Sequence, residues 1–147
     1  LAALRSGCDI VTDTQMARAG INKTILSSLG GTVHCFMSDP DVAAEAKARG
    51  ITRAYVSMER AAALPKPCIF AIGNAPTALC SLEALMEAGK LSPALIIGVP
   101  VGFVNVVESK ELIIRHARAP YIVARGRKGG SNVAAAVCNA MLYQIRR

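Results

Sequence analysis

Short runs of apolar residues alternate along this chain with stretches in which apolar residues recur at helical spacing. The apolar runs predict buried strands, and they lie at 8–12, 32–37, 68–72, 93–97 and 121–123. The helical patterns, several of them rich in alanine, lie at 41–49, 57–64, 78–88, 106–117 and 132–145. This alternation predicts a three-layer α/β/α fold with a mostly parallel sheet, in one domain that spans 1–147.

Two further segments have weaker patterns. Asp13 and Thr14 are candidate caps for a short helix over 16–19. The segment 51–56 combines β-branched residues with a tyrosine, so we expect an edge strand or an extended segment there.

Three loops rich in glycine or proline follow predicted strands, at 73–77, 98–103 and 125–131. Ligands of parallel α/β sheets bind beyond the carboxyl ends of the strands, so we expect these loops to share one edge and one site. Ordinary turns explain any one of the loops. Three of them on one edge favour a ligand site.

The last of these loops carries three cations, three glycines and a serine within seven residues. Glycine allows the backbone to approach a ligand closely, and Ser131 is a candidate cap for the helix that follows. A glycine loop at a helix N-terminus is a typical anion site. Its spacing differs from that of the nucleotide-binding P-loop, so the loop predicts an anion site of another kind.

Charge and composition narrow the class of partner. There are 17 Lys and Arg residues against 10 Asp and Glu residues, a net charge of +7, which favours an anionic partner. Only 4% of residues are aromatic and tryptophan is absent, which disfavours a nucleic-acid module that stacks bases. The five cysteines include no Cys-x-x-Cys pair, which indicates a reducing cytoplasm and no zinc site. Apolar stretches all fall short of the roughly 20 residues that span a bilayer.

Few side chains have the pattern of a catalytic group. His34 lies inside an apolar run, where we expect a core or sheet-face histidine, and His116 ends a predicted helix. Glu111 and Arg115 are four residues apart and are expected to form a surface pair.

Three polar residues leave two interpretations open. Arg53 is either an anion ligand or a solvated surface group. Asn74 and Thr77 either hydrogen-bond a ligand or cap the helix that follows them.

Four stretches of this sequence resemble the precorrin-8X methylmutase family, which includes the cobalt-precorrin-8 enzymes. They are DTQMARAGI at 13–21, GNAPTAL at 73–79, IGVPVGFVNVVESK at 97–110 and RGRKGGSNVA at 125–134. They occur in the family's order. The resemblance implies a flavodoxin-like fold, usually in a homodimer. It also implies an isomerase of cobalamin biosynthesis that moves a methyl group from C11 to C12 of a corrinoid precursor.

The resemblance also implies which residues act. The substrate is a tetrapyrrole with many carboxylates, and no metal or organic cofactor of the protein takes part. Carried over to this sequence, the substrate-binding positions are Arg53, Asn74, Thr77, Ser109, Lys110, Arg125, Lys128 and Ser131. The family's catalytic histidine lies in a His-Ala or His-Thr motif upstream of the position of Leu1. We therefore expect this chain to begin inside a longer protein, and neither of its own histidines is assigned that role.

Two other functions are compatible with these residues. One is a non-catalytic corrinoid or tetrapyrrole carrier, or an inactive fragment of the enzyme. The other is a nucleic-acid module that uses the net positive charge.

Overall fold

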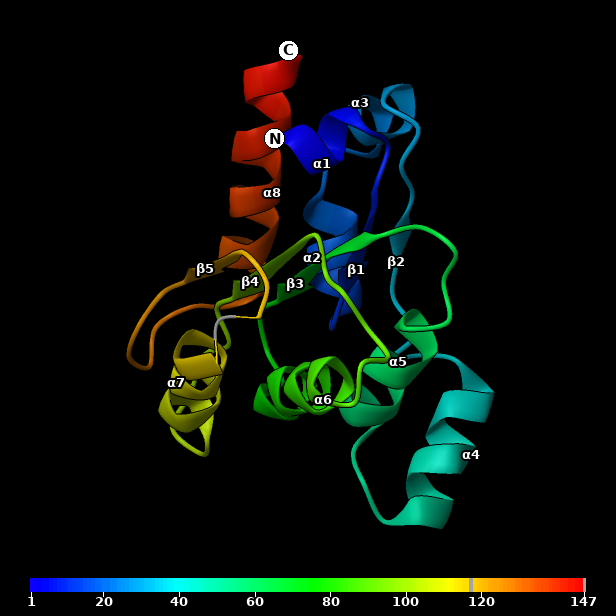
Figure 1. Ribbon diagram of the computed structural model, residues 1–147, viewed down its shortest axis with the longest axis vertical. Helices are drawn as coiled ribbons and strands as arrows, with labels where there is room; N and C mark the ends of the chain where they lie inside the picture. The colour runs from blue at the N-terminus through cyan, green and yellow to red at the C-terminus, as the bar shows by residue number, and fades with distance from the viewer. Residues whose placement is uncertain (117, 147) are drawn as a thin grey trace.

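A five-stranded parallel sheet forms the centre of the protein, in a computed structural model that describes residues 1–116 and 118–146 (Figure 1). The strands lie in the order β2-β1-β3-β4-β5, and every neighbouring pair is parallel. Their bounds are β1 Asp9–Thr12, β2 Val33–His34, β3 Cys68–Ile72, β4 Leu95–Gly98 and β5 Tyr121–Val123. The predicted α/β class and parallel sheet are thus confirmed.

Helices cover both faces of this sheet (Figure 1). One face carries α1 Ala2–Arg5, α2 Gln15–Gly20, α3 Lys23–Ser28 and α8 Ser131–Ile145. The other carries α5 Arg53–Ala61, α6 Pro76–Glu87 and α7 Val106–His116, with α4 Pro40–Arg49 packed outside α5. The predicted helix 106–117 is confirmed as far as His116, and its last residue, 117, lies outside the described residues. None of the helices in the described part of the chain could cross a membrane.

Each central strand is buried on both faces, which explains its continuous apolar run. In β3, Ile69 and Ala71 pack toward α8 and α3, while Phe70 and Ile72 pack toward α5 and α6. Two hydrophobic cores therefore lie back to back across the sheet.

The segment 51–56, predicted to be an edge strand or an extended segment, instead contains the start of helix α5. The side chain of Thr52 accepts a hydrogen bond from the Tyr55 N–H at 3.1 Å, which makes it an effective helix cap. Val56 is buried against Val42 of α4. Capping and helix packing outweigh the β propensity of this segment. A second difference is α3, which the sequence did not predict and which Asn22 caps in the same way.

His34 sits on the sheet face, as predicted, and is held by a buried carboxylate. The Asp9 carboxylate lies 3.0 Å from His34 Nε2 and accepts a hydrogen bond from the Thr32 N–H at 2.9 Å. The imidazole stacks on Phe36. Burial raises the pKa of Asp9, but the His34 ring, the Thr32 N–H and Lys66 together outweigh it and hold the pKa below its ordinary value.

This lowered pKa predicts an acid-sensitive contribution to stability. It is present above the unfolded-state pKa of about 3.9 and is lost as pH falls through the lower folded-state value. We expect Asp9→Asn to lower the free energy of unfolding by about 2 kcal/mol at pH 7. Urea unfolding from pH 7 to pH 2.5 should show this difference shrinking below about pH 4. A difference that stays constant over the whole range would contradict the assignment.

Candidate functional site

The loops that follow β3, β4 and β5 touch one another at the carboxyl end of the sheet. The Gly130 N–H donates to the Val99 carbonyl at 2.8 Å, and the Gly102 N–H donates to the Arg127 carbonyl at 3.1 Å. Gly73 lies against the backbone of Gly130. The three segments 73–77, 98–103 and 125–131 therefore form one continuous rim, as the sequence predicted.

Two glycines of the rim allow this close packing of backbone on backbone. A Cβ at Gly129 would lie 2.0 Å from the Val99 carbonyl oxygen, and a Cβ at Gly73 would lie 2.7 Å from the Gly130 oxygen. The sequence predicted that glycine would let the loop approach a ligand. The structure shows that these two glycines let the loops approach one another, which fixes the shape of the rim.

Asp13 anchors the first of these loops from beneath, a role that the sequence analysis missed. It follows β1 directly and is fully buried. Its carboxylate accepts hydrogen bonds from the backbone N–H groups of Gly73, Asn74 and Ala75 at 2.9, 2.9 and 2.6 Å. Burial raises the pKa of Asp13, and the three N–H donors oppose that rise. Asp13 and Thr14 were both predicted as candidate caps for the short helix, and the prediction is confirmed for Thr14, which caps α2.

Lys110 anchors the cationic loop in a similar way. It is fully buried, and its ammonium donates to the carbonyls of Gly126 and Lys128 at 2.7 and 2.9 Å. Burial lowers its pKa. Ser109 is also buried, and its hydroxyl donates to the Val106 carbonyl at 3.0 Å. Both residues were predicted to bind substrate; in this structure the Lys110 ammonium supports the cationic loop from inside, and the Ser109 hydroxyl bonds within α7.

Ser131 takes a different role from the predicted helix cap. Gly130 is the N-cap residue of α8, and Ser131 is the first helical residue. Its hydroxyl lies 2.8 Å from the Thr14 hydroxyl. This contact ties the segment after β1 to the start of α8.

The predicted polar positions near α6 lie at the start of that helix. Ala75 is the N-cap of α6, and among the described residues no side chain caps it, so the capping role considered for Asn74 and Thr77 is not observed. Asn74 is exposed on the rim. The Thr77 hydroxyl lies 2.8 Å from that of Thr52, which brings the exposed Arg53 beside this part of the rim.

Arg125 and Lys128 are both exposed on the cationic loop. Arg125 pairs with Glu111, with Nε–Oε1 and Nη2–Oε2 distances of 3.2 Å. Glu111 was predicted to pair with Arg115, but the fold brings the loop cation to it instead. The Arg125 side chain remains 69% exposed despite this bidentate pair, so its guanidinium is still accessible to a ligand.

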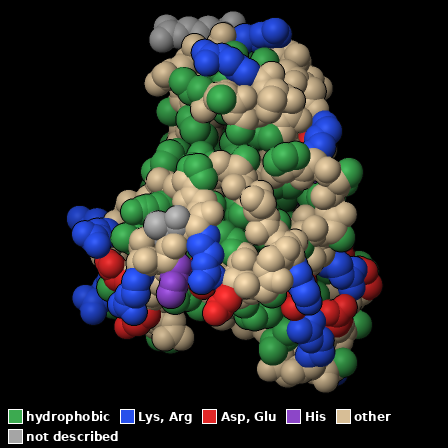
Figure 2. Space-filling view, viewed as in Figure 1, with side chains coloured by type: hydrophobic (Ala, Val, Ile, Leu, Met, Phe, Trp, Pro, Cys, Tyr) green, Lys and Arg blue, Asp and Glu red, His purple; other side chains and the backbone are tan. Residues whose placement is uncertain are grey.

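Cations elsewhere on the surface are paired more extensively. Figure 2 shows basic and acidic side chains mixed over α4 and α5. There Arg49 pairs with Glu45 and Glu59, and Arg60 pairs with Asp41 and Glu45. These charges neutralise one another locally, so they do not carry the net charge of +7.

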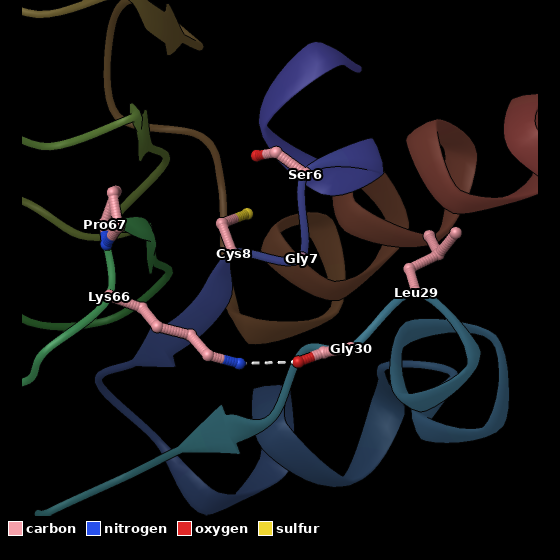
Figure 3. A pocket seen from close by; sticks show the side chains of 7 residues that line it. All are labelled: Ser6, Gly7, Cys8, Leu29, Gly30, Lys66 and Pro67. Carbon is pink, nitrogen blue, oxygen red and sulfur yellow. Dashed lines mark hydrogen bonds between the residues drawn. The ribbon is translucent and has the colours of Figure 1, made fainter.

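A pocket of about 320 Å³ lies at the opposite, amino-terminal edge of the sheet (Figure 3). Its Lys66 ammonium donates to the Gly30 carbonyl at 2.6 Å. Burial raises the pKa of the Cys8 thiol to about 11, which makes it a poor nucleophile. With its cation occupied and its thiol protonated, this pocket is a weaker candidate site than the rim.

Comparison with known proteins identifies the family. The model of the precorrin-8X methylmutase family matches residues 1–144. The chain is 48% identical to the cobalt-precorrin-8 methylmutase of Salmonella typhimurium, over 98% of this chain and 67% of that protein. It is 46% identical to the cobalt-precorrin-8 methylmutase of Priestia megaterium, over 96% of this chain and 62% of that protein.

A solved structure gives the same result. The structure of the precorrin-8X methyl mutase from Thermus thermophilus superposes with a TM-score of 0.86 at 38% identity, over 97% of this chain and 68% of that one. The chain thus spans 62–68% of the length of these three proteins. From its sequence motifs, its parallel sheet and these similarities, the chain belongs to the precorrin-8X methylmutase family, the isomerases of cobalamin biosynthesis.

Proposed function

We propose that this chain forms the corrinoid-binding part of a methylmutase that moves a methyl group from C11 to C12 of a precorrin-8 substrate. The observation that carries the proposal is the rim, where three loops in contact present exposed cations and hydrogen-bonding groups at one end of the sheet. The names of the relatives indicate a corrinoid precursor as the substrate. Because such a precursor carries many carboxylates, its charge is complementary to the rim.

The substrate-binding residues divide into two groups in this proposal. The first group binds substrate carboxylates: Arg53, Asn74, Arg125 and Lys128, which are exposed, and Thr77, which is half-buried beside Thr52. Ser109 and Lys110 act as positioning residues because they are buried, and Ser131 does so because its hydroxyl joins the start of α8 to Thr14. A fixed rim orients the macrocycle and reduces the entropic part of the barrier.

The reaction itself needs little beyond orientation and a proton donor. A sigmatropic shift moves the methyl group between neighbouring ring carbons with no net change in electrons. Protonation of a ring nitrogen makes the conjugated system a better electron sink, and a positioned acid contributes about 10²–10⁴-fold in rate. The resemblance assigns this acid to a histidine upstream of Leu1. Here His34 is bound to Asp9, and His116 Nδ1 lies 4.0 Å from Glu83.

The Arg125→Ala, Lys128→Ala double variant tests the binding role of the rim. Each charge-assisted contact to a carboxylate contributes about 1.5–3 kcal/mol, so we expect Kd to rise at least about tenfold. Titration with hydrogenobyrinic acid, the expected product, measures this by absorbance.

A Lys47→Ala, Lys90→Ala double variant is the matched control. It removes the same charge from exposed positions on α4 and after α6. Equal losses in the two double variants would indicate a general effect of charge and would remove the loop from the site. Incubation of the unsubstituted protein with precorrin-8X then separates an enzyme, which changes the absorption spectrum, from a carrier, which binds without turnover.

We also infer a cytoplasmic homodimer that does not bind nucleic acid. The five cysteines are free, which is typical of proteins in a reducing compartment. The homodimer follows from the family resemblance, and sedimentation equilibrium tests it. Nucleic-acid binding would appear as an affinity that falls steeply with salt and ignores ligand identity.

A further inference from the structure

An exposed apolar segment lies beside the cationic loop on the rim. Phe103 and Val104 are each 79% exposed, and Val101 is 47% exposed. Apolar side chains clustered at a surface mark a binding site more often than chance would give. All three residues lie in the short loop after β4, and Phe103 places an exposed aromatic ring on the rim.

The backbone holds this segment against the cationic loop. Gly102 has φ 126° and Asn105 has φ 60°, so both residues adopt left-handed conformations that shape the tip. The Gly102 N–H donates to the Arg127 carbonyl at 3.1 Å. The Arg127 guanidinium lies over the Phe103 ring, with Cζ 5.4 Å from the ring centroid. A cation–π contact and a backbone hydrogen bond thus join the two loops.

We propose that Phe103 and Arg127 form a recognition pair for the corrinoid ring, an inference that rests on the proposed function. Phe103, with Val101 and Val104, contacts an apolar face of the macrocycle. Arg127 binds a carboxylate at the edge of the same macrocycle. A corrinoid precursor is a disk with an apolar face and an anionic edge, so its recognition requires an apolar group and a cation a few ångströms apart. This pair supplies both. Neither residue is among the substrate-binding positions that the family resemblance implies.

Charge favours a corrinoid over a second copy of the chain as the partner of this apolar segment. The patch lies beside the exposed cations Arg125, Arg127 and Lys128. A symmetric contact between two copies would place these cations against one another, in a chain whose net charge is already +7. A carboxylate-rich ligand meets the same cations with opposite charge.

Two corrinoids with one ring system test the two parts of the pair. Hydrogenobyrinic acid carries free carboxylates, and its fully amidated derivative carries amides in their place; with no metal and no axial ligands, both leave the ring faces open to Phe103. For Phe103→Leu, which keeps an apolar side chain, we expect Kd to rise about fivefold for both ligands. For Arg127→Gln we expect a rise of about tenfold for the acid and little change for the amide. Because the two groups act together on one ligand, Kd for the double variant should rise by less than the product of the two single increases.

Arg18→Gln is the matched control, since Arg18 is an exposed cation on α2 whose side chain bonds only to Gln15 among the described residues. If the unsubstituted protein binds the acid and the Arg125, Lys128 double variant binds it less tightly, the proposed function stands. Unchanged affinities in Phe103→Leu and Arg127→Gln would then overturn this inference alone. Unchanged affinities with a shift from dimer to monomer in sedimentation would show that the patch is a subunit contact. Absence of corrinoid binding by the unsubstituted protein would overturn both proposals.

Discussion

Asp13→Asn is expected to lower the free energy of unfolding by about 3 kcal/mol and to abolish corrinoid binding. The substitution preserves the shape of the side chain, and it removes a buried charge whose desolvation raises the pKa of the carboxyl. It nevertheless turns one acceptor into an NH₂ group that faces a backbone N–H of 73–75. At least one buried donor then loses its partner, and the loop after β3 loses its fixed position.

Asp39→Asn is the matched control for this change. Asp39 is the N-cap residue of α4, but its side chain makes no capping hydrogen bond. A substitution at such a position usually changes stability by less than about 0.5 kcal/mol. Urea unfolding of both variants, with corrinoid titration beside it, measures the difference. Equal midpoints for the two variants would show that the three N–H contacts contribute little.

The sheet and the rim were predictable because they depend on local patterns. A continuous apolar run such as 68–72 indicates a strand buried on both faces, and it does so without knowledge of its neighbours. The carboxyl ends of parallel strands must meet at one edge, so the three loops had to converge once the strands were known. The place of the cations Arg125 and Lys128 at this edge was predictable for the same reason, because both lie in the loop after the last strand.

The supporting contacts beneath the rim were not predictable in this way. Asp13 and Gly73 are 60 residues apart, and no local pattern links them. A lysine is expected at the surface, and Lys110 is buried only because the fold brings two loop carbonyls to its ammonium. A signal for α5 was available, since Thr52 is a good helix cap, but the β-branched Ile51 and Val56 together with Tyr55 indicated an extended segment.

Gly129→Ala is expected to separate the two loops that its backbone now joins. The new Cβ would lie 2.0 Å from the Val99 carbonyl oxygen and 2.7 Å from its carbonyl carbon. These are backbone atoms and cannot rotate away, so the Gly130 N–H bond to Val99 at 2.8 Å must break as well. We expect a loss of about 3 kcal/mol in the free energy of unfolding, together with loss of corrinoid binding.

Two glycines of the same region separate steric clash from other effects of adding a methyl group. A Cβ at Gly98 would make ordinary contacts, the nearest at 3.4 Å with Val123, so we expect Gly98→Ala to cost less than about 1 kcal/mol. Gly126 faces open space but has φ +89°, so Gly126→Ala measures backbone strain alone, at about 1 kcal/mol. Urea midpoints for the three variants should therefore place Gly129→Ala well below the others. If Gly129→Ala has the same urea midpoint as Gly98→Ala, the contact between the loops is not what holds the rim together. Corrinoid binding must then depend on the side chains alone.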